Sequence, residues 1–302
     1  MANLNYSKLI KNVLQPGIQE NVFFADLKSL TDIFGSNDKV KPGTDIEDSF
    51  RVGYTSAGGS YTTSDSTDPV SSTQTIVNPK WTKKYYHEAV EVENIEIEQL
   101  GNAPAIKLVE DALETGAKAI MNRIFTDIMA QLELDIDKTG AYSTAALSRT
   151  TYPTLASYED NTATAITLAL FRSMYLASTL KKNAGGPGNY VCLMEQSVRS
   201  TFNELVGAAM TWNVNDPKQG QVIAGGKQNI ASFEGVDLAS PEGMGTGKVL
   251  LLRKPDVKID IHRPMIVKQV PSGKDSVKFV IYAGINGHSN KPGMAGKMTG
   301  KL

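Results

Sequence analysis

Four glutamates lie close together along one short stretch of the chain. Of all the residues in the sequence, this group most resembles a reactive site. Glu91, Glu93, Glu96 and Glu98 are interleaved with mostly apolar residues. Clustered carboxylates can bind a metal ion or act as a general acid and base. No histidine or cysteine lies among them, so we interpret these glutamates as a solvated face. The shift at Asn94 indicates a strand that bends or passes into a short helix there.

The three histidines and the single cysteine offer no better candidate. His87, His262 and His288 lie in separate segments, each without a second histidine or cysteine nearby. The spacings HExxH, CxxC and GxSxG are absent, so neither a zinc site nor a nucleophile elbow is indicated. Cys192 lies in an apolar run, and we interpret it as a small core residue. We expect no catalytic residue, no cofactor and no metal site, and therefore no enzyme.

Two other patterns begin like ligand-binding loops and then depart from them. The run from Asp135 starts as a calcium loop does, but Ala146 stands where the bidentate glutamate is required. The glycine-rich residues 185–188 follow a helix pattern and precede a strand pattern, which reverses the order of a phosphate-binding loop. We interpret neither pattern as a site.

Composition and charge exclude further classes of partner. The 302 residues carry a formal net charge of −1 without a basic block, so no surface that follows a phosphate backbone is expected. No apolar stretch approaches the roughly 20 residues of a membrane span, and no targeting signal is visible. We expect no membrane partner and no direct recognition of nucleic acid.

The elements that must position these residues begin with an arm and a long extended segment. Residues 1–42 predict two short apolar helices, which dock either on the body of the protein or on a neighbouring subunit. Residues 43–91 predict a two-stranded hairpin with a tip rich in Ser, Thr and Gly. Because an isolated hairpin is marginal in water, it should gain order on another surface. A disordered surface loop is the alternative for residues 55–72.

One long amphipathic helix is the clearest element of the sequence. Apolar residues recur every three or four positions between Ala103 and Leu134, with Asn102 as the expected N-cap. The stripe consists of Ile106, Val109, Leu113, Ala117, Ile120, Ile124, Ile128 and Leu132. About 30 residues make a rod of roughly 45 Å, which we expect to brace something thin and wide.

The remainder of the chain mixes helices and strands. The expected elements are helices at 166–180 and 197–206 (the second capped by Ser197) and strands at 190–194, 230–238, 249–252, 265–267 and 277–282. The tail, residues 286–302, is rich in Gly and Lys. We expect it to lie on the surface or at a contact between subunits.

In this order of segments, the chain resembles the major capsid proteins of tailed bacteriophages, which have the Hong Kong 97-type fold. The resemblance covers nearly the whole chain and depends on the arm, the return strand from Trp81 to Tyr86, the long helix and the helix–strand–helix of residues 166–209. It implies an α+β fold. Its parts would be an N-terminal arm (1–42), an extended β-hairpin loop (43–91), a peripheral domain with a spine helix (92–140 and 262–302) and an axial α/β domain (141–261).

The resemblance also implies a function. The chain would be a structural major capsid protein that self-assembles as pentamers and hexamers into an icosahedral phage head. The head would enclose double-stranded DNA without sequence-specific contact. A separate scaffolding protein and a portal would be further partners, because no long helical scaffold segment precedes the arm. The protein would be part of the virion capsid and would be assembled in the host bacterial cytoplasm.

Some members of that family join a lysine of the loop covalently to an asparagine of a neighbour. Lys80, Lys83 and Lys84 lie on the matching segment of this chain. Asn286 and Asn290 are conceivable partners. No motif fixes a pairing, so the crosslink is not carried over to this chain.

Contacts between subunits are expected along the return strand and the segment that follows it. The candidate residues are Lys80, Trp81, Lys83, Lys84, Tyr85, Glu88, Glu91 and Glu93. Their mixture of bases and acids could pair the loop of one subunit with the spine of the next.

Other functions are compatible with the same sequence. An encapsulin-type nanocompartment shell shares this fold but packages enzymes. A soluble enzyme with an unrecognised site would stay small in solution. A tail tube or another phage ring protein is disfavoured by the long helix.

Overall fold

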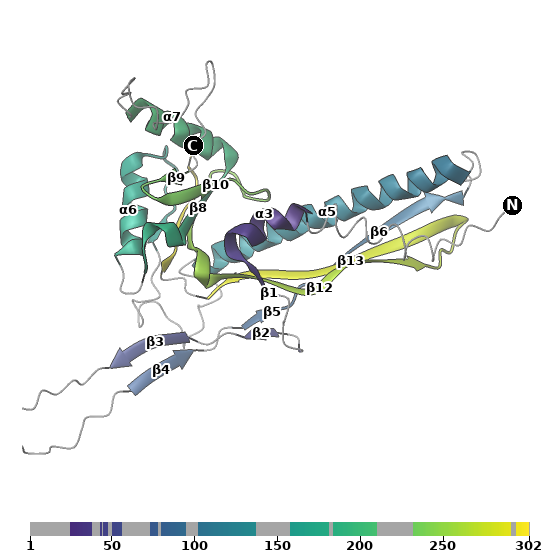
Figure 1. The fold of residues 1–302 in the computed structure, drawn as a ribbon, viewed down its shortest axis with the longest axis horizontal. Coiled ribbons are helices and arrows are strands. Elements are labelled where there is room, and N and C mark those ends of the chain that lie inside the picture. The colour runs from purple at the N-terminus through teal and green to yellow at the C-terminus, as the bar shows by residue number, and fades with distance from the viewer. Residues whose placement is uncertain are drawn as a thin grey trace, which may run out of the picture.

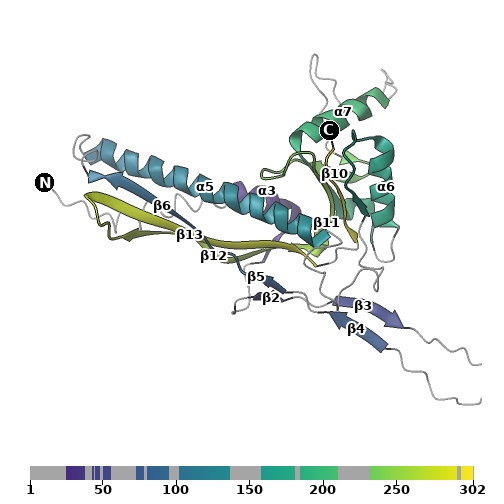
Figure 2. The same ribbon diagram turned by 180° about the vertical axis from the view of Figure 1, so that it is seen from behind.

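The computed structural model describes residues 25–37, 43, 45–47, 50–55, 73–77, 80–94, 102–136, 158–180, 184–209, 232–290 and 294–301. A long helix lies along an elongated sheet, and a more compact group of helices and strands sits at one end of both (Figure 1). Two strands project from that end as a ribbon, and the view from behind shows the same separation (Figure 2). Within the described residues, no helix is long and apolar enough to cross a membrane.

The elongated sheet has four strands in the order β1-β12-β13-β6. These are β1 (Ser36–Asn37), β6 (Tyr86–Glu93), β12 (Val257–Val270) and β13 (Ser276–Ser289). β12 and β13 form a long antiparallel hairpin, which confirms the strand pair predicted near the C-terminus. β6 pairs antiparallel with the first half of β13. β-branched and aromatic residues favour this extended conformation.

The long helix α5 (Asn102–Ile136) covers one face of the four-stranded sheet (Figure 1). It has 35 residues, a rod of about 50 Å, and it confirms the predicted helix. Every predicted stripe residue from Val109 to Leu132 is buried. Gly116 allows β6 to approach closely, because a Cβ there would lie only 2.6 Å from the Val90 side chain.

The compact group is built on a sheet of six strands in the order β7-β14-β11-β8-β10-β9. The strands are β7 (Tyr158–Asp160), β8 (Tyr190–Met194), β9 (Ser232–Phe233), β10 (Val236–Ala239), β11 (Val249–Arg253) and β14 (Gly296–Met298). The helices are α6 (Leu168–Thr179) and α7 (Gln196–Ala209), with the 3-10 turns η5 (Pro187–Asn189) and η6 (Lys254–Asp256). The whole of β8 is buried, as its apolar sequence predicted, and Cys192 is a core residue within it.

One apolar core joins the two large sheets through α5. Met129 and Leu132 of this helix belong to the same buried cluster as Leu250 of the six-stranded sheet and Ile285 of the four-stranded sheet. α6 and α7 pack with the opposite side chains of β8 and β11 in a second cluster. The six-stranded sheet is therefore covered on both faces, and α5 and the two sheets share one interior.

The extended segment forms two further two-stranded sheets. β2 (Asp45–Glu47) pairs antiparallel with β5 (Lys80–Thr82), and β3 (Phe50–Thr55) pairs with β4 (Thr73–Val77). β2 and β5 lie on the side of the four-stranded sheet opposite α5, whereas β3 and β4 project beyond it (Figures 1 and 2). We call β3 and β4 the ribbon, and β2 and β5 its base.

The arm and the loop tip are only partly described. α3 (Ala25–Phe34) confirms a helix in the second half of the arm, and Leu30 docks it in the core of the same chain. The first predicted arm helix and the predicted tip at 56–72 lie outside the described residues.

The C-terminal tail differs from the sequence-based expectation. Residues 286–289 complete the buried end of β13, and the Lys301 side chain is also buried, so the tail is not a surface segment. β14 hydrogen-bonds to β11 and β7. Residues 296–298 therefore lie in the six-stranded sheet, although the predicted range 262–302 grouped them with the spine helix. Gly296 permits this insertion, because a Cβ there would lie 2.5 Å from Met174.

The N-terminus of α7 is capped by a different residue from the one predicted. The Glu195 carboxylate accepts hydrogen bonds from the backbone N–H of Ser197 at 3.0 Å and of Val198 at 3.3 Å. The Ser197 hydroxyl also donates to this carboxylate. That bond, and then the backbone bonds, lower the pKa of Glu195, because they stabilise its charged form. Glu195, and not Ser197, is therefore the cap.

Candidate functional site at the base of the ribbon

The return segment, residues 80–93, carries all the predicted contact residues. Lys80, Tyr85, Glu88, Glu91 and Glu93 are exposed, Lys83 and Lys84 are half-buried, and Trp81 is buried. Because Trp81 is only 4% exposed within its own subunit, its side chain is not accessible for a contact with a neighbour. The contact role of the other residues stays a prediction.

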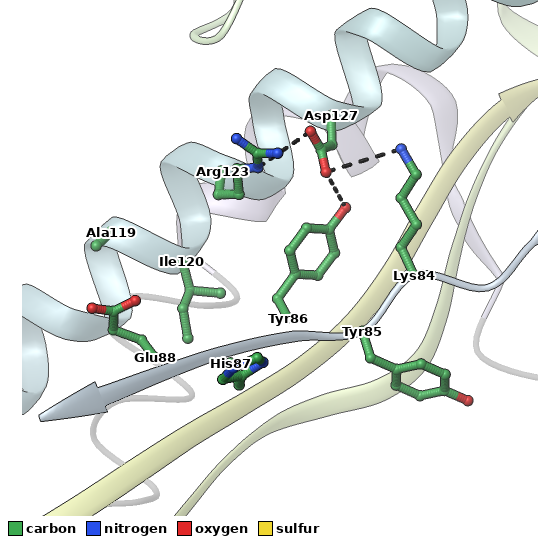
Figure 3. Close-up of a pocket in the computed structure, with 9 residues that line it drawn as sticks. All are labelled: Lys84, Tyr85, Tyr86, His87, Glu88, Ala119, Ile120, Arg123 and Asp127. Carbon is green, nitrogen blue, oxygen red and sulfur yellow. Dashed lines mark hydrogen bonds and ion pairs between the residues drawn. The ribbon is translucent and has the colours of Figure 1, made fainter.

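A groove of about 390 Å³ runs between the start of β6 and α5 (Figure 3). It is lined by Lys84, Tyr85, Tyr86, His87, Glu88, Ala119, Ile120, Arg123 and Asp127. Side chains alternate along the segment, so Lys84 and Tyr86 point toward the helix and Tyr85 points to the other side (Figure 3). Tyr85 is 62% exposed, which is unusual for a large ring.

Asp127 organises the charges of this groove. Its carboxylate accepts a hydrogen bond from the Tyr86 hydroxyl at 3.2 Å and lies 3.4 Å from Arg123 Nε and 3.9 Å from Lys84 Nζ. Burial, and then the nearby Asp127 charge, raise the pKa of Tyr86, so its phenol stays protonated and donates. The groove is therefore balanced internally, which suits a contact surface better than a reactive site.

Lys83 and Glu91, two of the residues predicted to pair between neighbours, also make polar contacts within their own subunit. Lys83 Nζ donates to the Gly43 carbonyl at 2.9 Å. Glu91 accepts hydrogen bonds from the hydroxyls of Ser272 and Ser276, and these bonds lower its pKa. Pairing of these charges between neighbours remains a prediction.

Two side chains of the long hairpin hold the return segment through its backbone. Asn286 donates from Nδ2 to the Thr82 carbonyl and accepts at Oδ1 from the Lys84 N–H, both at 2.9 Å. His262 Nε2 lies 3.0 Å from the Lys84 carbonyl, and the Tyr85 ring meets its imidazole edge-on at 4.9 Å. Burial lowers the pKa of His262, which favours the neutral ring.

Sequence reasoning missed this role for Asn286, which it considered only as a crosslink partner. Asn286 is 4% exposed, and both of its amide atoms are bonded within the subunit. The sequence signal was limited to a polar residue inside an otherwise apolar strand. Within the described residues, no group of three or more His, Cys, Asp or Glu side chains could hold a metal ion.

Comparison with known proteins identifies the fold. No family model and no curated protein matches the sequence. Among solved structures, the capsid asymmetric unit of cyanophage A-1(L) has a TM-score of 0.63 and 14% identity, over 90% of this chain and 92% of that chain. A virus-like particle from Pyrococcus furiosus has a TM-score of 0.54 and 9% identity, over 98% and 100%. The holo-SrpI encapsulin complex of Synechococcus elongatus has a TM-score of 0.51 and 12% identity, over 76% and 78%.

These similarities define the class of fold. The chain has the fold of tailed-phage major capsid proteins, the Hong Kong 97-type fold, as the order of its segments predicted. The similarity extends over most of this chain and of each of these two matched chains. At identities this low the comparison establishes the fold alone.

Proposed function

We propose that this protein is the structural subunit of a closed shell, a major capsid protein that assembles with copies of itself. The observation that carries the proposal is the ribbon. β3 pairs with β4, and the two strands extend away from the rest of the subunit (Figures 1 and 2). Two strands alone are marginal in water, so the ribbon needs a surface that its own subunit does not supply.

The four-stranded sheet offers such a surface on its far half. The base of the ribbon covers the face opposite α5 at Asn286 and His288, where Thr82 and Trp81 lie. Further along the same face stand Ile266, Lys268 and Tyr282, beyond the base. Arg263 lies over the Tyr282 ring at 4.8 Å from its centroid. Glu91 of β6 pairs with Lys278 on the same face, so this surface carries apolar, basic and acidic side chains. We propose that the ribbon of a neighbouring subunit lies on it.

Ribbon-to-sheet contact is heterologous, so it joins subunits head to tail and generates rings when the rotation closes. We propose pentamers and hexamers of this kind, combined into an icosahedral phage head around double-stranded DNA. In this proposal residues 141–261 form the axial part near the ring axis, and the spine helix with β12 and β13 forms the peripheral part. Interfaces of about 1,600 Å², repeated around each subunit, make the sum of contacts large although each is modest.

The partners and the role follow from that assembly. We propose a virion capsid location, assembly in the host cytoplasm, and a separate scaffolding protein and portal as partners. We also propose that the protein has no enzymatic activity. The charge-balanced groove at Asp127 and the formal net charge of only −1 support a packing role.

The proposal is tested by removing the ribbon while leaving its base intact. Glu47 and Lys80 face each other in the antiparallel ladder of β2 and β5. Residues 48–79 can therefore be replaced by an Asn-Gly turn, which closes such a ladder in two residues. We expect this variant to fold with unchanged circular dichroism, to remain monomeric in sedimentation and to form no shells under electron microscopy.

A matched control keeps the length and composition of residues 48–79 but scrambles their order. It separates loss of the paired strands from shortening of the connection, and it should also fail to assemble. Closed shells from the ribbonless variant would contradict the proposal. So would a full-length protein that stays monomeric at every concentration and salt condition.

A second candidate function is an encapsulin-type compartment, favoured by the similarity to the holo-SrpI encapsulin complex. The contents of shells purified from cells distinguish the two functions. Nuclease-protected double-stranded DNA supports the phage head. A single enriched cargo protein with no protected DNA supports the compartment.

A further inference from the structure

Trp81 anchors the base of the ribbon through a polar bond and not only through burial. Its indole N–H donates to Asp135 Oδ1 at 3.1 Å, in the last turn of α5. The ring also lies against the His288 imidazole, with 4.1 Å between centroids and 32° between planes. One residue of β5 thus contacts the end of the long helix and the end of β13.

Asp135 is itself held from two other directions. Ser289 donates its backbone N–H to Oδ2 at 2.8 Å, and Gln131 donates its side-chain N–H to Oδ1 at 2.9 Å. His288 Nδ1 lies 3.0 Å from Asp260 Oδ2, and both of these side chains are nearly fully buried. Hydrogen bonds therefore join β5, α5 and β13 in this cluster, and the close contact of His288 with Asp260 adds β12.

Asn286 and His262 extend the same attachment along the return segment. Asn286 brackets Thr82 and Lys84, as described above, and His262 reaches the Lys84 carbonyl. The segment from Trp81 to Lys84 is therefore fixed at Trp81, Thr82 and Lys84 by side chains of the long hairpin and α5. An apolar contact would let this segment slide or rotate at little cost, whereas buried hydrogen bonds hold one geometry.

We propose that the Trp81–Asp135–His288 cluster, with Asn286, is a latch that fixes the direction in which the ribbon leaves the subunit. This inference rests on the proposed function, because direction matters only if the ribbon reaches a neighbour. The ribbon continues from the base, so a small rotation at Trp81 moves its far end by a large distance. The latch thereby sets the angle between neighbouring subunits and the curvature of the shell.

The first test measures the latch in the isolated subunit. We compare hydrogen exchange at the Lys84 amide, which donates to Asn286, in the wild type and in Asn286→Ala, Trp81→Phe and Asp135→Asn. We expect tenfold or faster exchange in residues 82–84 for each variant, with core amides of α5 unchanged. Trp81→Phe keeps an aromatic ring at this position while it removes the indole N–H and part of the ring, so it is the mildest of the variants and keeps the test valid if another fails to fold.

The emission of Trp81 reports the same opening independently. The chain contains two tryptophans, so a Trp212→Phe background leaves Trp81 as the single reporter. In that background Asn286→Ala should shift the emission to longer wavelength, because the indole becomes exposed to water. Glu114→Ala is the matched control, since Glu114 pairs with Lys118 on the exposed side of α5. It should leave both the exchange and the emission unchanged.

The second test measures curvature. Latch variants should form assemblies of mixed diameter, including tubes and open sheets, where wild type and Glu114→Ala form shells of one diameter. Uniform wild-type shells from all three latch variants would overturn the proposal, as would unchanged exchange at Lys84. If the wild type formed no assembly, the proposed function would fail, and with it the role in curvature.

Discussion

The long helix α5 and the short strand β5 both attach to the four-stranded sheet, on opposite sides, by different chemistry. α5 is attached by an apolar face that runs from Val109 to Ile136 and is buried throughout. β5 is attached by one tryptophan and by hydrogen bonds to Asp135 and Asn286. Apolar burial supplies stability without direction, whereas buried hydrogen bonds supply direction at a modest net stability. The first attachment builds the body, and the second orients what projects from it.

The largest expected effect breaks the apolar attachment. Leu132→Ala removes a fully buried side chain from the core that joins both large sheets. We expect a loss of about 4 kcal/mol in the free energy of unfolding, from lost burial and the cavity left behind. Urea denaturation of the isolated subunit measures it. Asn122→Ala, on the exposed side of the same helix, should change the free energy of unfolding by less than about 0.5 kcal/mol. Equal losses in the two variants would show that the buried apolar face of α5 is not the source of the stability.

The next largest loss of stability is expected when the buried Lys301 contacts in the compact group are removed. Lys301 Nζ is buried and contacts Asp160 Oδ2 at 2.8 Å, the Thr162 carbonyl at 2.9 Å and Thr164 Oγ1 at 3.1 Å. Lys301→Met leaves Asp160 without its cation, and we expect a loss of about 3 kcal/mol. Thr164→Val removes a single acceptor and should cost about 1 kcal/mol. A stable Lys301→Met protein would show that packing alone holds the tail.

The same pair gives a dependence on pH. The hydrogen bond from Lys301 is the main cause that lowers the pKa of Asp160 to about 2, from an ordinary value of 3.8. Its contribution to stability is therefore present above pH 3.8 and is lost as the pH falls through about 2. Lys301→Met should remove this part of the acid dependence.

Asp135 of the latch gives a smaller dependence of stability on pH, in the opposite direction to that of Asp160. Burial raises the pKa of Asp135 to about 6 from an ordinary value of 3.8. Between these values the folded protein holds a proton that the unfolded chain has lost. Its contribution is therefore full below pH 3.8 and is lost as the pH rises through about 6. The free energy of unfolding of the wild type, relative to that of Asp135→Asn, should fall by on the order of 2 kcal/mol as the pH rises across this window. Thermal unfolding at a series of pH values measures this difference. A difference that does not change with pH would contradict the burial of the charge.

The smallest effect is expected on the solvent side of α5. Glu114 and Lys118 form an exposed pair at 2.7 Å, one turn apart. Glu114→Ala should change the free energy of unfolding by about 0.3 kcal/mol, and less in high salt. A loss above about 1 kcal/mol would mean that this side of the helix is not solvated in the folded subunit.

The fold could be predicted where its signal is local. The stripe on α5 repeats with the helical period, and the apolar run of β8 is continuous, so both were visible in the sequence. The tail was misjudged because Gly296 and Lys297 look like surface residues, although both are buried in β14. Gly296 is small because β14 packs closely against α6 at this point. That packing joins parts of the chain that are distant in the sequence, so no local pattern reveals it.

The latch could not be predicted, for a related reason. Trp81 and Asp135 lie 54 positions apart, and Asp135 and Ser289 lie 154 positions apart. No periodicity links residues at such separations, and each looks like an ordinary surface or strand residue by itself. The sequence placed Trp81 on the right segment but assigned it to a neighbour, because burial by the same chain leaves no local trace.

The position of β14 has a consequence for synthesis. This strand lies between β11 and β7, yet it is translated after both of them. β7 can join the sheet only when residues 296–298 have left the ribosome, since β14 is its partner. The compact group therefore completes its sheet late in translation, through contacts between distant parts of the chain. A nascent chain cannot present a finished compact group to other subunits until almost all of this sequence has emerged.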